Sequence, residues 1–329
     1  MSAAKAKTAG MRTTGQVVLW WVERLELNRS VSASYRRTMA SLMRCHVIPA
    51  LGQLTLKRLN RAEVDDRLVW PMQQTHSPHT VHKAVQGLLK ALALAVRQER
   101  IEANPLAGVG FKDFWSGKLP PKAAGLLPVD VPTLVPGLCV AFDKTPVAGM
   151  LALMMLAHGT RIGETCQARW QHISLTERVW IIPSQNTKTR QELVVPLTPQ
   201  ACALLTRYRE LQHPSRHGSP WVFATQGGGA LSATQASKLF AELSGRQWTS
   251  HDLRKLARTV WAEIGVDYLV GEMLLNHSMG MLASTYIRTT ADHLRREALT
   301  RWHEWLDARG FAEAHGLKND ETGITTEAA

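Results

Sequence analysis

The stretch from Asn104 to Gly137 constrains the fold of this 329-residue chain more than any other part. It holds six prolines and several glycines, which disfavour both helix and strand because proline lacks a backbone N–H and glycine is costly to order. Basic residues at 112, 118 and 122 would let it follow a phosphate backbone. A chain of this length also fits two domains better than one small module. The sequence therefore predicts a basic linker over residues 109–137 that joins two domains.

The part before this linker predicts a compact helical domain over residues 14–108, preceded by a basic tail at residues 1–13. Apolar residues recur at helical spacing, and Pro49, Gly52 and Pro71 are typical helix stop signals. The longest pattern begins at Ser77 with Pro78 in the first helical position, where proline is favoured. The predicted helices are Val17–Leu27, Ser32–Val47, Asn60–Val69 and Ser77–Ile101.

The part after the linker predicts a second domain over residues 138–310. Helices are expected at Val147–His158 and Ile162–Trp170, and two short β-branched segments predict a hairpin of Trp180–Pro183 with Leu193–Leu197. The chain is helical again from Thr198. Residues 311–329 are acidic and poor in apolar groups, which predicts a disordered tail. The fold class is mainly α with a small β-hairpin or sheet (α+β).

The charge of the chain indicates the class of its partner. Lys and Arg number 39 against 27 Asp and Glu, for a net charge of +12 and a pI near 9.9. That excess favours a polyanionic partner, with nucleic acid first and an acidic membrane surface second. No apolar run approaches the roughly 20 residues that span a bilayer, and no export signal is visible. We expect a cytoplasmic, nucleoid-associated protein that does not engage a membrane.

The cysteines and histidines give no sign of a metal enzyme. The four cysteines are widely spaced, without a C-x-x-C pair, and the thirteen histidines form no H-E-x-x-H motif. We expect four reduced cysteines, most of them buried, and neither a disulfide framework nor a structural zinc site.

Several polar residues of the second domain are unremarkable one at a time but informative together. An isolated arginine, a His–Arg pair on one helix face or a histidine at a helix end usually has only a structural role. In chain order, however, the sequence presents Arg161 in HGTRIGE, Lys188 in a turn, His251 and Arg254 in SHDLRKLART, His277 in LLNHS, and Tyr286 nine residues later.

This order and spacing resemble the tyrosine recombinase (phage integrase) family. The resemblance covers most of the chain, from the Y-R-R…P-A-L-G segment of the helical domain to about residue 309. It implies a helical core-type DNA-binding domain and a catalytic domain that form a clamp around DNA. Only about thirteen residues precede the helical domain, so the expected layout is that of the compact two-domain members, without a separate arm-binding domain.

The chemistry of these residue types agrees with the resemblance. Tyr286 can store the energy of a cleaved phosphodiester as a phosphotyrosine ester, without ATP, metal or another cofactor. Arg161 and Arg254 can grip the non-bridging phosphate oxygens, on which negative charge grows in the transition state. His277 can donate a further hydrogen bond, and His251 can assist proton transfer at the nucleophile.

The resemblance assigns Lys188 as the acid that protonates the departing 5′-oxygen, with Arg190 as a less favoured substitute. Glu164 either orients Arg161 or complements the helix dipole. Several positions depart from the common family pattern without removing a reacting group. Thr160 stands for Leu, Lys255 for His, and Asn276 for the Gly before His277, while His172 and Ser174 stand where acids are frequent.

The partners implied are double-stranded DNA recombination sites and further copies of the chain, with a tetramer in the synapse and accessory DNA-bending or directionality factors. The helix expected at Asp292–Arg309 carries Trp302 and Trp305, which would dock onto a neighbouring protomer. The first reading is integration or excision of a phage or other mobile element. The alternatives are a Xer-like dimer resolvase, a type IB topoisomerase, or a catalytically silent DNA-binding relative.

Overall fold

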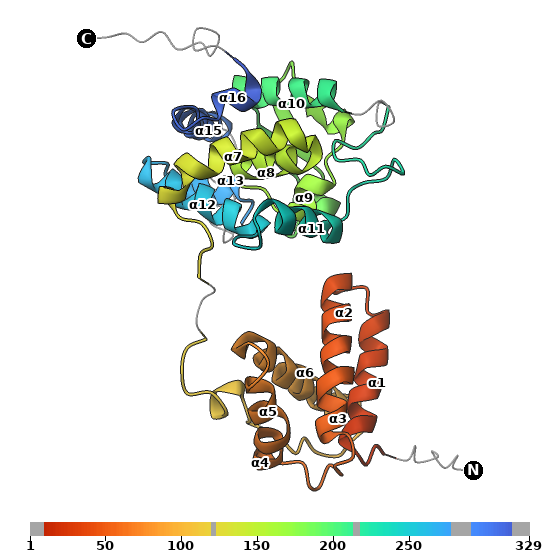
Figure 1. The fold of residues 1–329 in the computed structure, drawn as a ribbon. Helices are drawn as coiled ribbons and strands as arrows, with labels where there is room; N and C mark the ends of the chain where they lie inside the picture. Colours follow the sequence, from red (N-terminus) through yellow and green to blue (C-terminus); the bar gives the residue numbers. More distant parts are fainter. Residues whose placement is uncertain (1–9, 120–122, 213–217, 278–290, 318–329) are drawn as a thin grey trace. The chain divides into compact units, whose positions relative to one another are not determined.

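The computed structural model describes residues 10–119, 123–212, 218–277 and 291–317. The chain divides into two compact units, residues 1–122 and 123–329, and each is described here by itself (Figure 1). The described residues are mostly helical, with one three-stranded antiparallel sheet in the second unit. The predicted fold class, mainly α with a small sheet, is confirmed.

The first unit is a helical domain built on two long helices. Its elements are α1 (Thr14–Leu27), α2 (Ala33–Leu42), α3 (Ile48–Leu51), α4 (Arg61–Val64), α5 (Trp70–Gln73) and α6 (Pro78–Arg97). One face of α6 is apolar, and it packs against α1 and α2. Val18 and Val22 of α1 and Leu88 and Leu92 of α6 are fully buried, which makes this contact the centre of the unit's core.

Two prolines that were predicted to end helices lie inside continuous helical segments instead. Each follows a π-helical stretch, Met43–Val47 before Pro49 and Asp65–Val69 before Pro71. The residue before each proline closes an i→i−5 hydrogen bond: Ile48 N–H donates to Met43 O, and Trp70 N–H to Asp65 O. A wider turn of this kind accommodates proline, which has no N–H to donate. The helical path therefore continues to Leu51 and Gln73.

The predicted limits of the N-terminal tail and the linker also need correction. Of the predicted tail, residues 10–13 belong to the folded unit, because Met11 N–H donates to Arg100 O and Arg12 O accepts from Leu56 N–H. At the other end, helix α7 (Val131–Lys144) begins inside the predicted linker. Pro132 lies in its first turn, where no intrahelical N–H is required, and Pro136 removes only one hydrogen bond.

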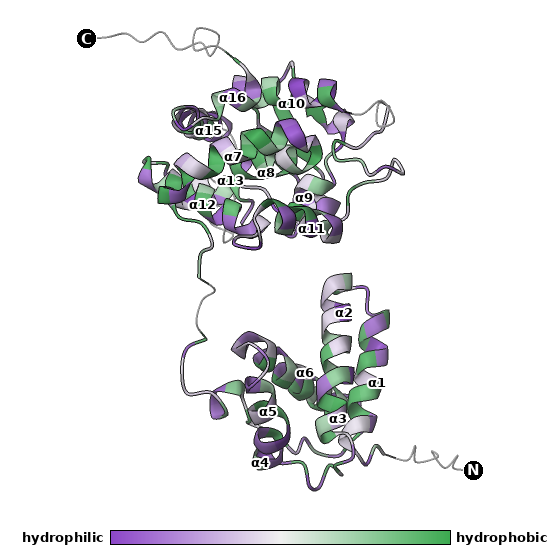
Figure 2. Cartoon of the chain, in the orientation of Figure 1, coloured by the Kyte–Doolittle hydropathy of each residue, from purple (hydrophilic) through white to green (hydrophobic). Residues whose placement is uncertain are grey.

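The second unit is built around one fully apolar helix. Helix α8 (Pro146–His158) contacts α7, α9 (Ile162–Cys166), α10 (Pro199–Leu211), α11 (Ala233–Leu243), α12 (Ser250–Glu263) and α15 (Ala291–Asp307). Every residue from Gly149 to His158 is buried, and Figure 2 colours most of this helix as hydrophobic. A helix that is apolar all round is typical of the centre of a domain. The chain also forms α13 (Tyr268–Leu274) and α16 (Ala312–His315).

The predicted hairpin is present and has a third strand. Strands β1 (Ile173–Ser174), β2 (Val179–Ile182) and β3 (Leu193–Pro196) pair antiparallel in the order β1-β2-β3. In the register Trp180 lies opposite Val195, and both side chains are buried. The loop between β2 and β3 contains Lys188.

The C-terminal segment is more ordered than the sequence predicted. Residues 311–317 are not tail: Phe311 and Ala314 are buried, and Arg207 donates to the carbonyls of Glu313 and Ala314. Trp302 of α15 is fully buried in its own unit, where its Nε1 donates to Leu156 O at 3.2 Å. Trp305 stacks on Trp302 with ring centroids 5.3 Å apart. Trp302 therefore packs within its own unit, and Trp305 is half-buried against it. Docking of this helix onto a neighbouring protomer stays a prediction.

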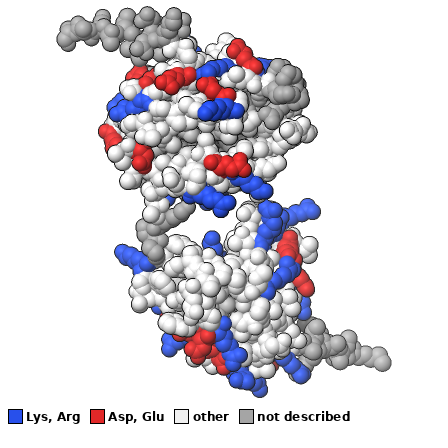
Figure 3. Space-filling model, viewed as in Figure 1, with Lys and Arg blue, Asp and Glu red and all other residues white. Residues whose placement is uncertain are grey.

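Lys and Arg side chains lie on the surfaces of both units (Figure 3). Among the described residues, no helix is both long enough and apolar enough to cross a membrane. The four cysteines are free thiols, of which Cys139 and Cys166 are buried, Cys202 is partly buried and Cys45 is exposed.

Two histidines are buried together, His158 at the end of α8 and His303 on α15. His303 shares a 2.6 Å hydrogen bond with the Thr198 hydroxyl and a 2.9 Å bond with Ala157 O, and its ring lies 5.5 Å from that of His158. Burial lowers the pKa of His158 to about 4, and burial together with the neighbouring His158 lowers that of His303 to about 3. Both imidazoles are therefore neutral in the folded chain at neutral pH.

We predict that acid destabilises the second unit between pH 6.5 and pH 4. The unfolded chain binds protons at these histidines at higher pH than the folded chain does, because folding lowers their pKa. The free energy of unfolding therefore decreases as pH falls below the unfolded pKa of about 6.5. For two such histidines the loss at pH 5 is about 4 kcal/mol. Urea unfolding at a series of pH values measures it. His158→Gln should roughly halve the pH dependence, and His79→Gln, exposed on α6, should leave it unchanged. An unaltered slope in His158→Gln would contradict the assignment.

Candidate active site

The two predicted phosphate-binding arginines meet at one backbone carbonyl. Arg254 lies on α12 and is only 4% exposed, with its Nη1 donating to Gly159 O at 2.6 Å and its Nη2 to Leu275 O at 2.7 Å. Arg161 follows the end of α8 and directs its Nη1 to the same Leu275 carbonyl at 3.4 Å. Residues 161, 254 and 275, far apart in the chain, thus form one cluster.

The arginine cluster carries concentrated positive charge. Burial, followed by the charge of Arg161, lowers the pKa of Arg254 to about 10, so the guanidinium stays protonated at neutral pH. An anion that reached this cluster would relieve the repulsion between the two cations. Paired guanidinium groups of this kind suit a phosphate, whose oxygens they can contact in a fixed geometry.

Arg161 is held in place by its local backbone. It is the N-cap residue of α9, and the buried carboxylate of Glu164 accepts both from Arg161 N–H at 2.9 Å and from Arg161 Nη1 at 2.8 Å. The Thr165 hydroxyl donates to Arg161 O at 3.1 Å and shares a 2.7 Å hydrogen bond with the Thr160 hydroxyl. Of the two roles left open for Glu164, direct orientation of the Arg161 side chain is the one the geometry favours.

His277 follows a helix end with the hydrogen bonds of a Schellman motif. Asn276 N–H donates to Met273 O and His277 N–H to Glu272 O, while Asn276 takes the left-handed conformation with φ of +48°. This turn brings the His277 ring to Arg254, whose Nη2 donates to His277 Nε2 at 3.0 Å.

The other ring nitrogen of His277 is oriented by a carboxylate. Because Nε2 accepts from Arg254, Nδ1 carries the proton and donates to Glu272 Oε2 at 2.6 Å. Arg258 Nε donates to the other oxygen of Glu272 at 2.9 Å. Burial raises the pKa of Glu272, but hydrogen bonds from His277 and Arg258 outweigh it, and the net shift is downward. Glu272 therefore stays ionised and fixes the ring.

His251 lies one turn before Arg254, exposed in the first turn of α12. Desolvation lowers its pKa, and the charges of Lys255, Arg254 and Arg161 lower it further. The imidazole is therefore neutral at neutral pH and able to accept a proton, as a general base must be.

Of the remaining predicted residues, Lys188 lies near the cluster and Tyr286 lies outside the described residues. Lys188 is exposed in the β2–β3 loop. Its neighbour Thr189 donates through its hydroxyl to Asn276 Oδ1 at 3.2 Å. The structure thus brings Arg161, Arg254 and His277 together and connects the Lys188 loop to them through Asn276.

Sequence reasoning missed three parts of the site: the carbonyls of Gly159 and Leu275, the carboxylate of Glu272, and the side chain of Asn276. Backbone carbonyls leave no mark in a sequence. Glu272 had a weak signal, since it stands five residues before His277. Asn276 had a clearer one, because Asn after an apolar helix is the commonest replacement for a C-terminal Gly in the left-handed conformation.

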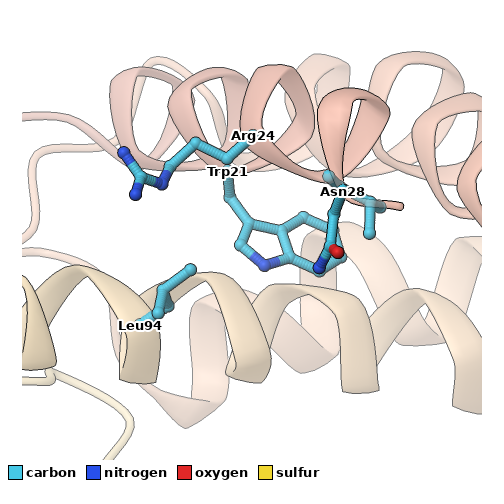
Figure 4. Close-up of a pocket in the computed structure, with 5 residues that line it drawn as sticks. Trp21, Arg24, Asn28 and Leu94 are labelled. Carbon is cyan, nitrogen blue, oxygen red and sulfur yellow. The ribbon is translucent and has the colours of Figure 1, made fainter. Parts of the chain in front are cut away.

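Other features of the described residues lie apart from this cluster. A hollow between α1 and α6 of the first unit is lined by Trp21, Arg24, Leu25, Asn28 and Leu94 (Figure 4). None of the predicted site residues lines it. No group of three or more His, Cys, Asp or Glu side chains in the described part of the chain is arranged to hold a metal ion.

Comparison with known proteins gives consistent matches. The family model described as "Phage integrase family" matches residues 135–293. The prophage integrase IntA of Escherichia coli K12 is 24% identical over 295 residues, covering 88% of this chain and 68% of the relative. The tyrosine recombinase XerD of Lacticaseibacillus casei is 26% identical over 233 residues, covering 67% and 75%.

The fold is also that of solved integrase structures. A lambda integrase tetramer bound to a Holliday junction matches with a TM-score of 0.65 at 15% identity, over 85% of this chain and 84% of that one. The Tn1549 transposon integrase in complex with transposon right end DNA matches with a TM-score of 0.61 at 18% identity, over 87% and 98%.

We predict that Gly159→Ala destabilises the second unit by about 2–4 kcal/mol, the sum of left-handed backbone strain and overpacking. Gly159 has φ of +62°, and an added Cβ would lie 2.8 Å from Trp261 Cη2 and 3.0 Å from Leu275 Cδ2. Urea unfolding measures the loss. Gly163→Ala is the matched control, because its Cβ would meet nothing within 4 Å on helix α9. Equal stability of the two variants would refute the packing argument.

Proposed function

Because the chain belongs to the phage integrase family of tyrosine recombinases, we propose that it cuts and rejoins double-stranded DNA at specific sites. The observation that carries the proposal is the meeting of Arg161, Arg254 and His277 at one turn of the backbone. Two guanidinium groups and an imidazole in one place suit a phosphodiester whose non-bridging oxygens gain charge in the transition state.

The proposed reaction is a transesterification. The Tyr286 oxygen attacks the phosphorus, the bond from phosphorus to the 5′-oxygen breaks, and a 3′-phosphotyrosine ester forms. His251 accepts the tyrosine proton, and Lys188 donates a proton to the departing 5′-oxygen. Rejoining runs the same steps backwards with a 5′-hydroxyl as nucleophile. The phosphodiester energy is kept in the ester, so the cycle uses neither ATP nor a metal ion.

The His277 geometry adds a condition to this scheme. In the structure its Nε2 accepts from Arg254 and its Nδ1 donates to Glu272. To donate to a phosphate oxygen from Nε2, His277 has to carry a proton on both ring nitrogens. A bound phosphate therefore competes with His277 Nε2 for the Arg254 guanidinium.

The proposed partners are DNA recombination sites and further copies of the chain. Lambda integrase is a tetramer on a Holliday junction in one solved structure and a dimer on a core site in another. We propose a similar tetrameric synapse here, with accessory bending or directionality factors, acting on DNA of the nucleoid in the cytoplasm.

We propose integration or excision of a mobile element as the biological role, on the similarity to a prophage integrase and the integrase of phage P4. Dimer resolution is the second candidate, because XerD and XerC proteins are also similar, at 26% and 23% identity. Sequencing the DNA that becomes covalently attached to the protein, and mapping it to a genome, separates the two roles. An integrase would be attached to attachment sites, and a resolvase to a chromosomal or plasmid dimer site.

We predict that Tyr286→Phe abolishes covalent attachment to DNA while DNA binding is retained. The substitution removes only the attacking oxygen. The measurement uses the full chain with nicked duplexes of randomised sequence, and counts the DNA that stays attached to protein in SDS. Tyr268→Phe is the control, since Tyr268 is 66% exposed on α13 and should keep full attachment.

A covalent adduct in Tyr286→Phe would place the nucleophile elsewhere. If the unaltered chain formed no adduct, the alternative function would be favoured, in which the chain binds DNA without catalysis.

We also predict that Lys188→Ala slows cleavage by about 10²-fold or more, the usual range for loss of a general acid. A substrate with sulfur in the bridging 5′ position leaves as a thiolate, which needs little protonation. The variant should cut this substrate at close to the rate of the unaltered chain. Arg161→Ala should stay defective on both substrates, because its role is charge stabilisation. If Arg190→Ala alone were rescued by sulfur, the acid would be Arg190.

A further inference from the structure

Asn276 is placed to connect the loop that carries Lys188 with the arginine cluster. It lies in the left-handed conformation between Leu275, whose carbonyl accepts from both arginines, and His277, whose ring contacts Arg254. Only 8% of Asn276 is exposed. A glycine would meet the backbone requirement at this position more cheaply, so the side chain calls for an explanation of its own.

Both ends of the Asn276 amide are directed to the β2–β3 loop. Its Oδ1 accepts from the Thr189 hydroxyl at 3.2 Å, and its Nδ2 lies 3.5 Å from the Gln191 carbonyl, to which it donates. The donor and the acceptor of one amide therefore contact residues on the C-terminal side of Lys188. An aspartate would lack the donor, and a glycine would lack both contacts.

The loop itself is braced on the other side of Lys188. Thr187 is 5% exposed, and its hydroxyl is within hydrogen-bond distance of Ser184 O at 3.0 Å and Gln191 O at 2.8 Å. The Gln191 carbonyl is thus shared between Thr187 and Asn276. With both neighbours of Lys188 held, the position of its Cα is set by these contacts, while its long side chain stays exposed and free to turn.

We propose that Asn276 is a positioning residue that holds the Lys188 loop in register with the phosphate-binding cluster. The inference rests on the proposed function, since it assigns a purpose to the Lys188 position. Three consecutive residues then have three roles. The Leu275 carbonyl accepts from the arginines, the Asn276 amide holds the Lys188 loop, and the His277 ring contacts the phosphate. The backbone of Lys188 is then held beside a phosphate bound by the cluster, which lowers the entropy cost of the proton transfer.

The test compares Asn276→Gly with Lys188→Ala on two DNA substrates, one with oxygen and one with sulfur in the bridging 5′ position. Glycine keeps the left-handed turn, so the helix end and His277 should be preserved. We expect Asn276→Gly to cut the oxygen substrate about 10-fold more slowly at unchanged DNA affinity, and the sulfur substrate at close to the rate of the unaltered chain. Amide hydrogen exchange of residues 184–192 should also become faster in the absence of DNA.

Thr189→Val is the matched partner variant, because it removes the hydroxyl and keeps the shape. It should reproduce part of the defect, and the double variant should be no slower than Asn276→Gly alone, as expected when two residues act through one contact. Unchanged loop exchange in Asn276→Gly, an equal defect on both substrates, or full additivity with Thr189→Val would each overturn the proposal.

Failure of the proposed function gives a different pattern. In that case Lys188→Ala itself would be equally defective on the oxygen and sulfur substrates, or the unaltered chain would form no adduct at all. The loop exchange needs neither DNA nor chemistry, so it decides whether Asn276 holds the loop in either case.

Discussion

The carbonyl of Leu275 is the point on which the candidate site depends. It accepts from the guanidinium groups of Arg161 and Arg254, which come from the end of α8 and the middle of α12. Two like charges stay this close because the protein offers them backbone oxygens and the carboxylates of Glu164 and Glu272. The charge that remains is available for the proposed phosphate, so the contacts that stabilise the buried Arg254 also fit the site for an anion.

The apolar helix α8 fixes the geometry around that carbonyl. Six neighbouring helices contact α8, and the helix ends at Gly159, which has the left-handed conformation. The Gly159 carbonyl accepts from Arg254, and Arg161, two residues later, is the N-cap residue of α9. The buried His303 bonds the last turn of α8 to α15, through Ala157 O. A packed core thus holds the arginines, while hydrogen bonds of Thr187 and Asn276 hold the loop that carries Lys188.

Much of this arrangement was predictable from residue order and spacing. The helices Val17–Leu27 and Val147–His158 and the β2–β3 pairing follow from apolar periodicity, which burial enforces. The predictions were wrong where they relied on proline or on local composition to end a helix or to mark a linker or tail. Pro49 and Pro71 were accommodated by π-helical turns. Residues 131–137 and 312–315 are helical, because apolar side chains of these segments pack on the domain. Trp302, which was expected to contact a neighbouring protomer, is instead buried in its own unit.

The sequence by itself determined the class of fold, and it predicted the family and the set of reacting groups, because these follow from residue types and their order along the chain. Tertiary structure alone decided that Leu275 receives both arginines, that Glu272 orients His277, and that the Asn276 amide reaches Thr189. The physical reason is that hydrogen bonds to backbone carbonyls and across distant segments depend on where the folded backbone passes. Spacing along the chain carries no record of that path.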